Sequence, residues 1–358
     1  MKKNILIICP YPENEVPAQR LKYEQYFIYF RDNGYSIKVS PFFDLKYYKI
    51  LYTEGNYKLK ILGTLIGYAK RIIQIFKIPF YDGIYIFLYV TPFGGSFFER
   101  VYRALSRRFI YDIDDLAFMG KTSNNNSLVA SLRGPEKYFY LMKVADHVIT
   151  CTPYLDMIVR KYNPNTTDIS STINTEKYFP IENYKNDHRI ILGWSGSHST
   201  IPYLKLLAPV LRRLREQYDF KLLVIGTSNF EIKGVDVEAL PWNESNEVRE
   251  LRRIDVGLYP LPNEEWVLGK SGLKALQYMA LGIPTVATAI GANFRVIEDG
   301  FSGYLVNSDD EWVTRLKALL ENPSLRKQIG ECGRARVEKY YSLHANEPVY
   351  LDIFRRVF

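Results

Sequence analysis

Short apolar runs alternate with longer amphipathic stretches through the first half of the chain. The runs predict buried strands, and the stretch from about Gln19 to Asn33 has the spacing of a helix. The predicted strands are Ile5–Cys9, Ser36–Ser40, Gly83–Val90, Phe109–Asp112 and His147–Thr150. Alternation of this kind is typical of an α/β fold in which helical crossovers join parallel strands.

The same alternation of strand-like and helix-like segments begins again after the polar segment 182–188. A helix is predicted near Pro202–Gln217, and strands are predicted at Arg189–Trp194, Lys221–Ile225, Val235–Leu240 and Val256–Pro260. The length of 358 residues suits two domains of ordinary size. We therefore predict two Rossmann-like domains, residues 1–185 and 186–340, with a linker near residues 180–188.

Composition narrows the class of protein and of partner. Hydrophobic residues make up 47% and charged residues 24%, which is globular rather than disordered composition. The net charge of +8 and the 29 tyrosines favour an acidic partner, which is a nucleic acid, an anionic lipid or a phosphate-bearing ligand. Charge alone does not choose among these three.

The cysteines and the lengths of the apolar runs indicate the cellular compartment in which the protein is expected. The cysteines Cys9, Cys151 and Cys332 are odd in number and far apart, which predicts a reduced, cytoplasmic protein. The first apolar run, Ile5–Cys9, is too short for a signal peptide and is interpreted as a strand. Because no window approaches roughly 20 uninterrupted apolar residues, we expect no transmembrane helix.

Residues 46–80 form a basic amphipathic segment. Lysines and arginines, among them Lys58, Lys60, Lys70 and Arg71, are interleaved with tyrosines, leucines and isoleucines. A segment of this kind lies on an anionic membrane surface, or it is an ordinary helix with a solvated basic face.

The first candidate site is a strand that runs into a Gly/Ser loop before a helix. Glycines let the backbone approach a ligand closely, and free N–H groups at a helix start, with serine hydroxyls, favour a phosphate. The candidate residues are Gly193, Ser195, Gly196, Ser197 and Ser199, with Thr200 and His198 in the same loop. The alternative is a plain turn in which Ser199 or Thr200 caps the helix.

The second candidate site is the loop that opens the helix near Leu273. Backbone donors and a lysine at a helix start again suit phosphate oxygens, and Lys274 lies one turn further on. The candidate residues are Gly269, Lys270, Ser271, Gly272 and Lys274. Alternatively, one or both lysines are solvated surface charges.

These motifs support a family resemblance. The stretch Lys270–Gly291, followed by Val296–Leu305, resembles the nucleotide-sugar signature of retaining GT-B glycosyltransferases of family four, the glycosyl transferases group 1. The likeness covers nearly all of the C-terminal half and the N-terminal half more loosely. It implies two Rossmann-like domains with parallel sheets facing across a cleft, and a C-terminal helix, residues 341–358, that packs back on the first domain.

The chain departs from this family at the residues that meet the donor. Most members carry two glutamates eight positions apart, and here Gly269 and Gln277 stand in their places. Gln277 can still hydrogen-bond a ribose hydroxyl. The sugar contact is left to backbone groups of this loop or to Glu265. Members also place an arginine and a lysine after the first C-terminal strand, so we infer that Lys270, with Lys274, supplies that charge, as in a variant subgroup with a Gly-Lys opening.

In the N-terminal half the resemblance suggests where an acceptor is held. Asp114 and Asp115 follow a predicted strand, and in relatives a histidine or aspartate near this point positions the sugar or the acceptor hydroxyl. Arg20, after the first strand, either clamps an acceptor phosphate or is a solvated charge. Asp114 is also a candidate catalytic base, or else caps a loop. His147 is interpreted as a packed strand residue. No metal or cofactor is expected, because protein groups usually stabilise the leaving diphosphate in these enzymes.

The resemblance thus predicts a glycosyltransferase (hexosyltransferase type) with a nucleoside-diphosphate sugar as donor. The expected acceptor is a glycan or a polyprenyl-diphosphate-linked glycan of bacterial surface polysaccharide synthesis, used with retention at the inner face of the plasma membrane. Nucleic acid is not an expected partner. Two alternatives remain open, namely a sugar-nucleotide epimerase of the same fold and a non-catalytic protein that binds polyanions or lipids.

Overall fold

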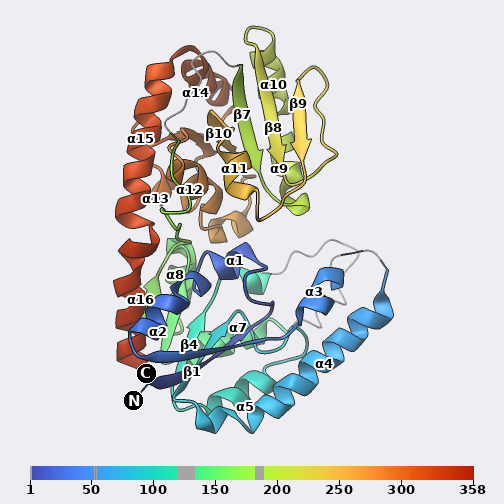
Figure 1. Cartoon of the computed structure of the whole chain (residues 1–358), viewed down its shortest axis with the longest axis vertical. Helices are drawn as coiled ribbons and strands as arrows, with labels where there is room; N and C mark the ends of the chain where they lie inside the picture. Colours follow the sequence, from blue (N-terminus) through green and yellow to red (C-terminus); the bar gives the residue numbers. More distant parts are fainter. Residues whose placement is uncertain (1, 52, 54, 120–133, 182–188) are drawn as a thin grey trace. The chain divides into compact units, whose positions relative to one another are not determined.

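The computed structural model divides the chain into two compact units, one of Met1–Ser171 with Asn346–Phe358 and one of Thr172–Ala345 (Figure 1). It describes residues 2–51, 53, 55–119, 134–181 and 189–358. The first unit ends earlier than the predicted position 185, because Ile173 already hydrogen-bonds to Tyr341 and Leu343 of the second unit. Most of the predicted linker, residues 182–188, lies outside the described residues.

The first unit contains a six-stranded parallel sheet of order β2-β1-β3-β4-β5-β6. The strands are β1 (Lys3–Cys9), β2 (Tyr35–Pro41), β3 (Gly83–Phe87), β4 (Phe109–Asp112), β5 (His147–Thr150) and β6 (Thr166–Asp168). The chain reverses its direction across the sheet between β1 and β3. Ligands of open parallel sheets bind at such a switch point, beyond the carboxyl ends of the strands.

Helices cover both faces of this sheet. They are α1 (Pro17–Arg20), η1 (Glu24–Tyr26), α2 (Phe27–Asp32), α3 (Leu45–Leu51), α4 (Tyr57–Ile75), η2 (Ile78–Phe80), α5 (Phe97–Leu105), η3 (Ala117–Met119), α7 (Glu136–Val144), α8 (Pro153–Val159) and the end of α16 (Leu343–Val357). The core of one face joins Tyr102 of α5 and Leu141 of α7 to the strands. On the other, Phe30 of α2 stacks on Phe354 of α16 with ring centroids 4.0 Å apart.

The helix predicted from Gln19 to Asn33 is broken into α1, η1 and α2. The break coincides with two polar side chains that turn inward. The Gln19 amide donates to the Tyr11 carbonyl oxygen at 3.0 Å, and Lys22 is paired with buried Asp112 at the end of β4. A regular helix is therefore replaced by turns that tie the loop after β1 to the sheet.

The second unit repeats the plan with a sheet of order β12-β11-β10-β7-β8-β9. Its strands are β7 (Ile190–Ser195), β8 (Phe220–Ile225), β9 (Val237–Leu240), β10 (Val256–Tyr259), β11 (Thr285–Thr288) and β12 (Tyr304–Val306). Here the switch point lies between β7 and β10, because β8 and β9 extend the sheet on one side and β11 and β12 on the other. The predicted α/β class is confirmed in both units.

Helices again lie on both faces of the sheet. They are η4 (His198–Thr200), α9 (Ile201–Lys205), α10 (Ala208–Arg215), α11 (Glu247–Leu251), η5 (Glu265–Gly269), α12 (Leu273–Ala280), α13 (Asn293–Val296), α14 (Asp309–Glu321) and α15 (Pro323–Tyr340). Figure 1 shows α10 beside β7 and β8, with Leu211 and Leu214 in their common core. The single helix predicted near Pro202–Gln217 is divided, because Pro209 lacks the N–H group that would continue α9 into α10.

Candidate functional site

The loop after β7 largely satisfies its own backbone. The amide of Ser195 donates to the Tyr278 hydroxyl at 2.7 Å, and the amide of Gly196 to the Ile225 carbonyl at 2.9 Å. The amide of Ser197 donates to the hydroxyl of Thr200 at 3.0 Å. These three amides are not free to cradle a phosphate, so the prediction of a backbone cradle is wrong for them.

The structure also places the caps of this loop. Ser197 is the N-cap residue of η4, and Thr200 occupies the N-cap position of α9, as the alternative of a plain turn predicts, but without a side-chain cap hydrogen bond. The hydroxyls of Ser197 and Ser199 lie 2.8 Å apart, so both stay at the same end of the loop. Gly193 lies inside β7, where an added Cβ would come within 2.2 Å of Ile254. Gly193 therefore serves close packing, and its contact with a donor stays a prediction.

A second glycine, Gly226, allows the loop after β7 to pack closely on the loop after β8. Gly226, directly after β8, has a φ of +134°, and a Cβ there would lie 1.9 Å from the carbonyl oxygen of Gly196. No residue with a side chain fits at this close approach. The loops after β7 and β8 are thus in direct backbone contact at the carboxyl edge of the sheet.

The loop after β10 leads through η5 to the start of α12. Gly269 and Ser271 are buried, and Gly272 takes a left-handed φ of +78° as the residue before α12. The ammonium nitrogen of Lys270 lies 5.8 Å from the centroid of the Trp266 ring, so the indole holds this lysine by a cation–π contact. Glu265, the alternative sugar contact, is exposed on η5.

Lys274 connects the two predicted loops. Its Nζ lies 3.3 Å from Oγ of Ser195 at the end of β7 and 3.0 Å from Oε1 of Gln277 on its own helix. The Gly/Ser turn and the lysine-bearing turn therefore meet at the switch point of the second sheet. Tyr278 fixes the same end of β7, because its buried hydroxyl accepts a hydrogen bond from the Ser195 amide. Burial raises the pKa of this hydroxyl.

Gln277 is buried and hydrogen-bonded inside the protein. Its Nε2 donates to the Tyr178 hydroxyl and to Oε1 of Glu247, both at 3.2 Å. Glu247, on α11, also accepts from the Tyr178 hydroxyl at 2.8 Å and from the Trp242 indole at 3.1 Å. The amide of Gln277 thus lies between the Lys274 cation and a buried carboxylate, and its contact with a ribose stays a prediction.

Sequence reasoning missed Glu247. Positions 269 and 277 lack the expected carboxylates, and the second unit instead carries a buried carboxylate at position 247. No periodicity or motif marks this residue, because its partner Gln277 lies 30 positions away in the sequence. Trp242, which follows β9, is 37% exposed, and its indole N–H donates to this carboxylate.

The predicted acceptor residues lie in the first unit. Arg20 is buried, which contradicts its interpretation as a solvated charge. Asp114 and Asp115 are half-buried after β4, and Asp115 takes a φ of +53°, which is rare for a residue with a side chain. Lys22 donates to the Ile113 carbonyl at 3.1 Å, so the segment that holds Arg20 is tied to the aspartate loop.

The basic segment 46–80 forms α3, α4 and η2. Arg71, predicted as part of a basic face, is instead fully buried and donates to the carbonyl oxygens of Cys9 and Val90 at 3.0 and 2.8 Å. It therefore ties α4 to the ends of β1 and β3, at the switch point of the first sheet. Lys70 pairs with Asp44 at 2.6 Å.

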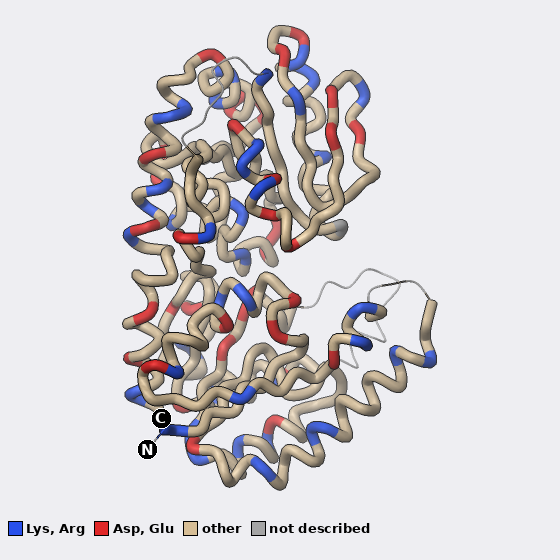
Figure 2. The backbone as a smooth tube through the Cα atoms, viewed as in Figure 1, with Lys and Arg blue, Asp and Glu red and all other residues tan. Residues whose placement is uncertain are grey.

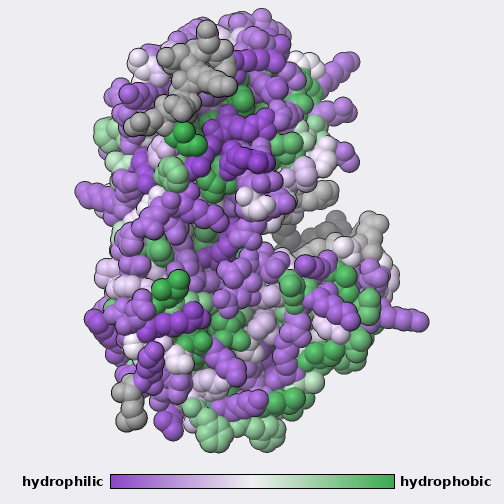
Figure 3. Space-filling view, in the orientation of Figure 1, coloured by the Kyte–Doolittle hydropathy of each residue, from purple (hydrophilic) through white to green (hydrophobic). Residues whose placement is uncertain are grey.

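A series of large apolar side chains on α4 and η2 is exposed. They are Tyr57, Leu59, Ile61, Leu62, Leu65, Ile72, Ile73, Phe76 and Phe80. Figure 3 shows apolar side chains gathered on this face of the first unit, and Figure 2 shows lysines and arginines along the same helix. Among the described residues, no helix is long and apolar enough to cross a membrane.

Of the described histidines, His147 is packed within the first sheet. His147 lies buried in β5 and bonds to Thr167 at 2.9 Å, as expected of a packed strand residue. In the part of the chain that the structure describes, no three histidine, cysteine or acidic side chains lie close enough to hold a metal ion together. His188 lies outside the described residues.

Sequence comparison relates the second unit to a known family. Residues 189–322 match the family glycosyl transferases group 1. A D-inositol 3-phosphate glycosyltransferase of Arthrobacter sp. is 32% identical over 173 residues, which are 41% of this chain and 40% of that protein. The capsular polysaccharide biosynthesis glycosyltransferase CapM of Staphylococcus aureus is 26% identical over 159 residues, 41% of this chain and 39% of CapM. The chain thus spans two fifths of the length of these relatives.

Structural comparison extends over the whole chain. Sucrose-phosphate synthase from Thermosynechococcus elongatus superposes with a TM-score of 0.70 at 14% identity, covering 99% of both chains. Anabaena HepE, in complex with UDP, gives a TM-score of 0.66 at 14% identity over 100% of both chains. The fold is therefore that of the GT-B glycosyltransferases, with two Rossmann-like domains.

Proposed function

We propose that this protein is a glycosyltransferase that moves a sugar from a nucleoside-diphosphate donor held by the second unit. The observation that carries the proposal is the position of Lys274, which contacts Ser195 at the end of β7 and lies in the first turn of α12, the helix after β10. The loops after β7 and β10 flank the switch point, where open parallel sheets bind their ligands. The match of residues 189–322 to glycosyl transferases group 1 supports the same assignment.

Charge supplied by lysines is the main chemical contribution of this site. The amides of Ser195, Gly196 and Ser197 are engaged within the protein. In our proposal the diphosphate is therefore met by the ammonium groups of Lys274 and Lys270, with the hydroxyls of Ser197 and Ser199. A cation held where negative charge develops lowers the barrier to departure of the leaving group. We assign Lys270 to this catalytic role, with Lys274 on the neighbouring oxygens.

The reaction that follows from this arrangement needs little from side-chain bases. In our proposal the acceptor hydroxyl attacks with retention at the anomeric carbon, and the departing diphosphate takes its proton. Asp114 is the candidate base if one is used, with Arg20 and Asp115 as acceptor contacts. Neither a metal ion nor a cofactor is part of the proposal.

The relatives suggest probes for donor and acceptor. HepE has been crystallised with UDP and with UDP-glucose, so a UDP-hexose is the first donor to test. CapM is named for capsular polysaccharide synthesis. For this chain we propose a glycan acceptor carried on a polyprenyl diphosphate, reached from the cytoplasmic face of the membrane, because α4 presents apolar and basic side chains and is tied through Arg71 to the switch point of the first sheet.

Calorimetric titration tests the donor site. A panel of nucleoside diphosphates, beginning with UDP, identifies the one that binds the wild-type protein. We expect Lys274→Gln and Lys270→Ala each to weaken its binding by about tenfold or more, since a charge-assisted contact is worth roughly 1.5–3 kcal/mol. Lys327→Gln, at an exposed lysine of α15, serves as the control. Wild-type affinity in both site variants would defeat the proposal.

Product analysis separates transfer from its alternatives. A sugar-nucleotide epimerase would convert the donor with no acceptor present, whereas the proposed transferase requires one. A protein that binds only polyanions or lipids would bind none of the nucleoside diphosphates and would release heparin as salt rises. Epimerised donor, or heparin binding without nucleotide binding, would each replace the present proposal.

A further inference from the structure

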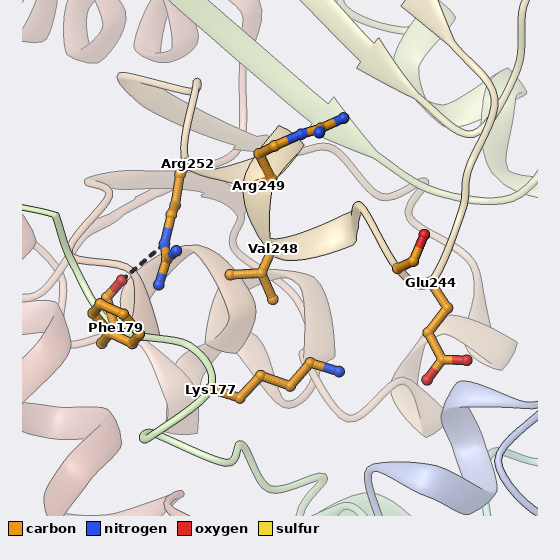
Figure 4. Close-up of a pocket in the computed structure, with 7 residues that line it drawn as sticks. Lys177, Phe179, Glu244, Val248, Arg249 and Arg252 are labelled. Atoms are coloured by element: carbon orange, nitrogen blue, oxygen red, sulfur yellow. Dashed lines mark hydrogen bonds between the residues drawn. The ribbon is translucent and has the colours of Figure 1, made fainter.

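A second basic site lies in the second unit, apart from the residues of the proposed donor site. A pocket of about 490 Å³ is lined by the start of α11 with the loop before it and by the segment that precedes β7. Its lining residues are Lys177, Phe179, Glu244, Ser245, Val248, Arg249 and Arg252. Three of these carry positive charge and one carries negative charge, so the pocket is basic (Figure 4).

Arg252 is held in place without a carboxylate partner. Its Nε donates to the Phe179 carbonyl oxygen at 3.1 Å, and its guanidinium lies 4.1 Å from the centroid of the Phe179 ring. Its buried Nη2 has no hydrogen-bond partner among the described residues. Burial lowers the pKa of this arginine, and no described carboxylate opposes that effect.

Two arginines near Arg252, Arg249 on α11 and Arg253 directly after the helix, do have carboxylate partners. Arg253 pairs with Glu238 at 2.5 Å and Glu250 at 2.8 Å. Arg249 pairs with Glu250 at 2.9 Å. The Arg252 guanidinium is only partly buried, but it is fixed in orientation and pairs with no described carboxylate, whereas Arg249 and Arg253 do. The positive charge of Arg252 is therefore not neutralised by a described carboxylate, and the side chain suits an anionic ligand.

We propose that this pocket binds a soluble phosphate ester whose phosphate meets Arg252, with Lys177 as the second cation. The guanidinium fork of an arginine matches the oxygens of a phosphate. The pocket is much larger than a phosphate alone, and Phe179 and Val248 offer apolar surface for a ring or an alkyl group of the ligand. None of the lining residues belongs to the donor loops, although α11 also carries Glu247, which bonds to Gln277. The proposed binding of a phosphate ester does not require that the protein transfers a sugar.

Phenyl phosphate is a suitable probe, because it carries both an anion and a ring. Calorimetric titration should be done in a Lys274→Gln background, so that the proposed donor site contributes little. We expect Arg252→Gln to weaken binding by about tenfold or more, and Lys177→Gln, at an exposed residue, by about two- to fivefold. Arg213→Gln, at an exposed arginine paired with Asp310, should leave binding unchanged.

Several outcomes would overturn the assignment. Unchanged affinity in both Arg252→Gln and Lys177→Gln, or equal loss in Arg213→Gln, would remove the pocket as the binding site. Binding of inorganic phosphate as tight as that of phenyl phosphate would remove the contact with Phe179. Because Lys177 is exposed, its variant keeps the test readable if Arg252→Gln fails to fold. A failure of the donor proposal shows separately, as wild-type UDP affinity in Lys274→Gln.

Discussion

The amide of Gln277 fits its buried position in a way that a carboxylate would not. Its Oε1 accepts from Lys274 and its Nε2 donates to Glu247. Only an amide can accept from the one and donate to the other at the same time. A glutamate at position 277 would place a second carboxylate about where Nε2 now lies, next to Glu247, and two buried carboxylates at that distance repel. In this chain the buried carboxylate of the pair lies on α11 and its amide partner on α12.

This interpretation predicts that the two residues are coupled. Gln277→Glu should lower the free energy of unfolding by roughly 1–3 kcal/mol, because it replaces a donor by a second buried acceptor. Adding Glu247→Gln should restore much of that loss, since the double variant again has one amide and one carboxylate. Urea denaturation of the wild type, both single variants and the double variant measures the coupling. Strictly additive losses would refute the exchange.

At the scale of elements, β5 carries a histidine that makes stability depend on pH. Burial, with a smaller contribution from Arg356, lowers the pKa of His147 to about 4, from an ordinary value near 6.5. The unfolded chain therefore binds a proton in a window where the folded chain does not. Stability from this residue is complete above pH 6.5 and is lost as the pH falls toward 4.

Replacing His147 by asparagine should flatten this dependence. We expect the wild-type protein to lose stability between pH 6.5 and 4, and His147→Asn to lose less over the same range. His344→Asn is the matched control, because that histidine is exposed on α16. Denaturation midpoints at several pH values provide the measurement. Parallel curves for the wild type and His147→Asn would contradict the assignment.

The helix α4 is packed closely on the first unit along one side and exposes large apolar side chains along the rest. Gly63 and Gly67 let it pack against Tyr47 and Phe42, where added Cβ atoms would come within 2.7 and 2.4 Å of those rings. The exposed apolar side chains lie on the rest of the helix, beside lysines. An anchored helix with exposed apolar and basic residues suits an anionic membrane surface.

Flotation with anionic vesicles tests this role of α4. Leu65→Glu combined with Ile72→Glu should lower the vesicle-bound fraction by at least about tenfold, since each buried apolar side chain contributes roughly 1.5–3 kcal/mol. Ile28→Glu, at an exposed residue of α2 in the same unit, should leave binding unchanged. Equal binding by the double variant and the wild type would exclude α4 as the membrane contact.

Helices and strands could be predicted from the sequence where a local pattern of apolar residues determines them. Strands such as β1 and β8 are apolar runs, and they appear where the sequence places them. The edge strand β6, of sequence Thr-Thr-Asp, carries no apolar signal and was missed. Glycines and serines marked the first loop of the site and glycines and lysines the second, whereas Glu247 and Arg71 act through contacts between distant segments. Such contacts become visible only once the sheets are assembled.

At the scale of the whole chain, the C-terminal helix belongs to two units. α16 begins at Leu343 in the second unit, and from Asn346 onward it belongs to the first. In the first unit Tyr350 packs on Tyr26 with ring centroids 4.4 Å apart, and Phe354 stacks on Phe30. The last residues of the chain thus complete the core beside its first strands, although the second unit lies between them in the sequence.

Removing one ring of α16 should therefore affect the first unit and spare the second. We expect Phe354→Ala to cost roughly 3–5 kcal/mol of stability in the first unit, because it leaves a cavity among Phe30, Tyr35 and Tyr85. Hydrogen exchange followed by mass spectrometry should show lost protection in β1 and β3 and native protection in β7 and β10. Val349→Ala, at a partly exposed position of the same helix, should change neither set of strands. Equal loss of protection in both sheets would mean that the two units unfold together, so that the helix stabilises the chain as one cooperative body rather than closing the core of the first unit.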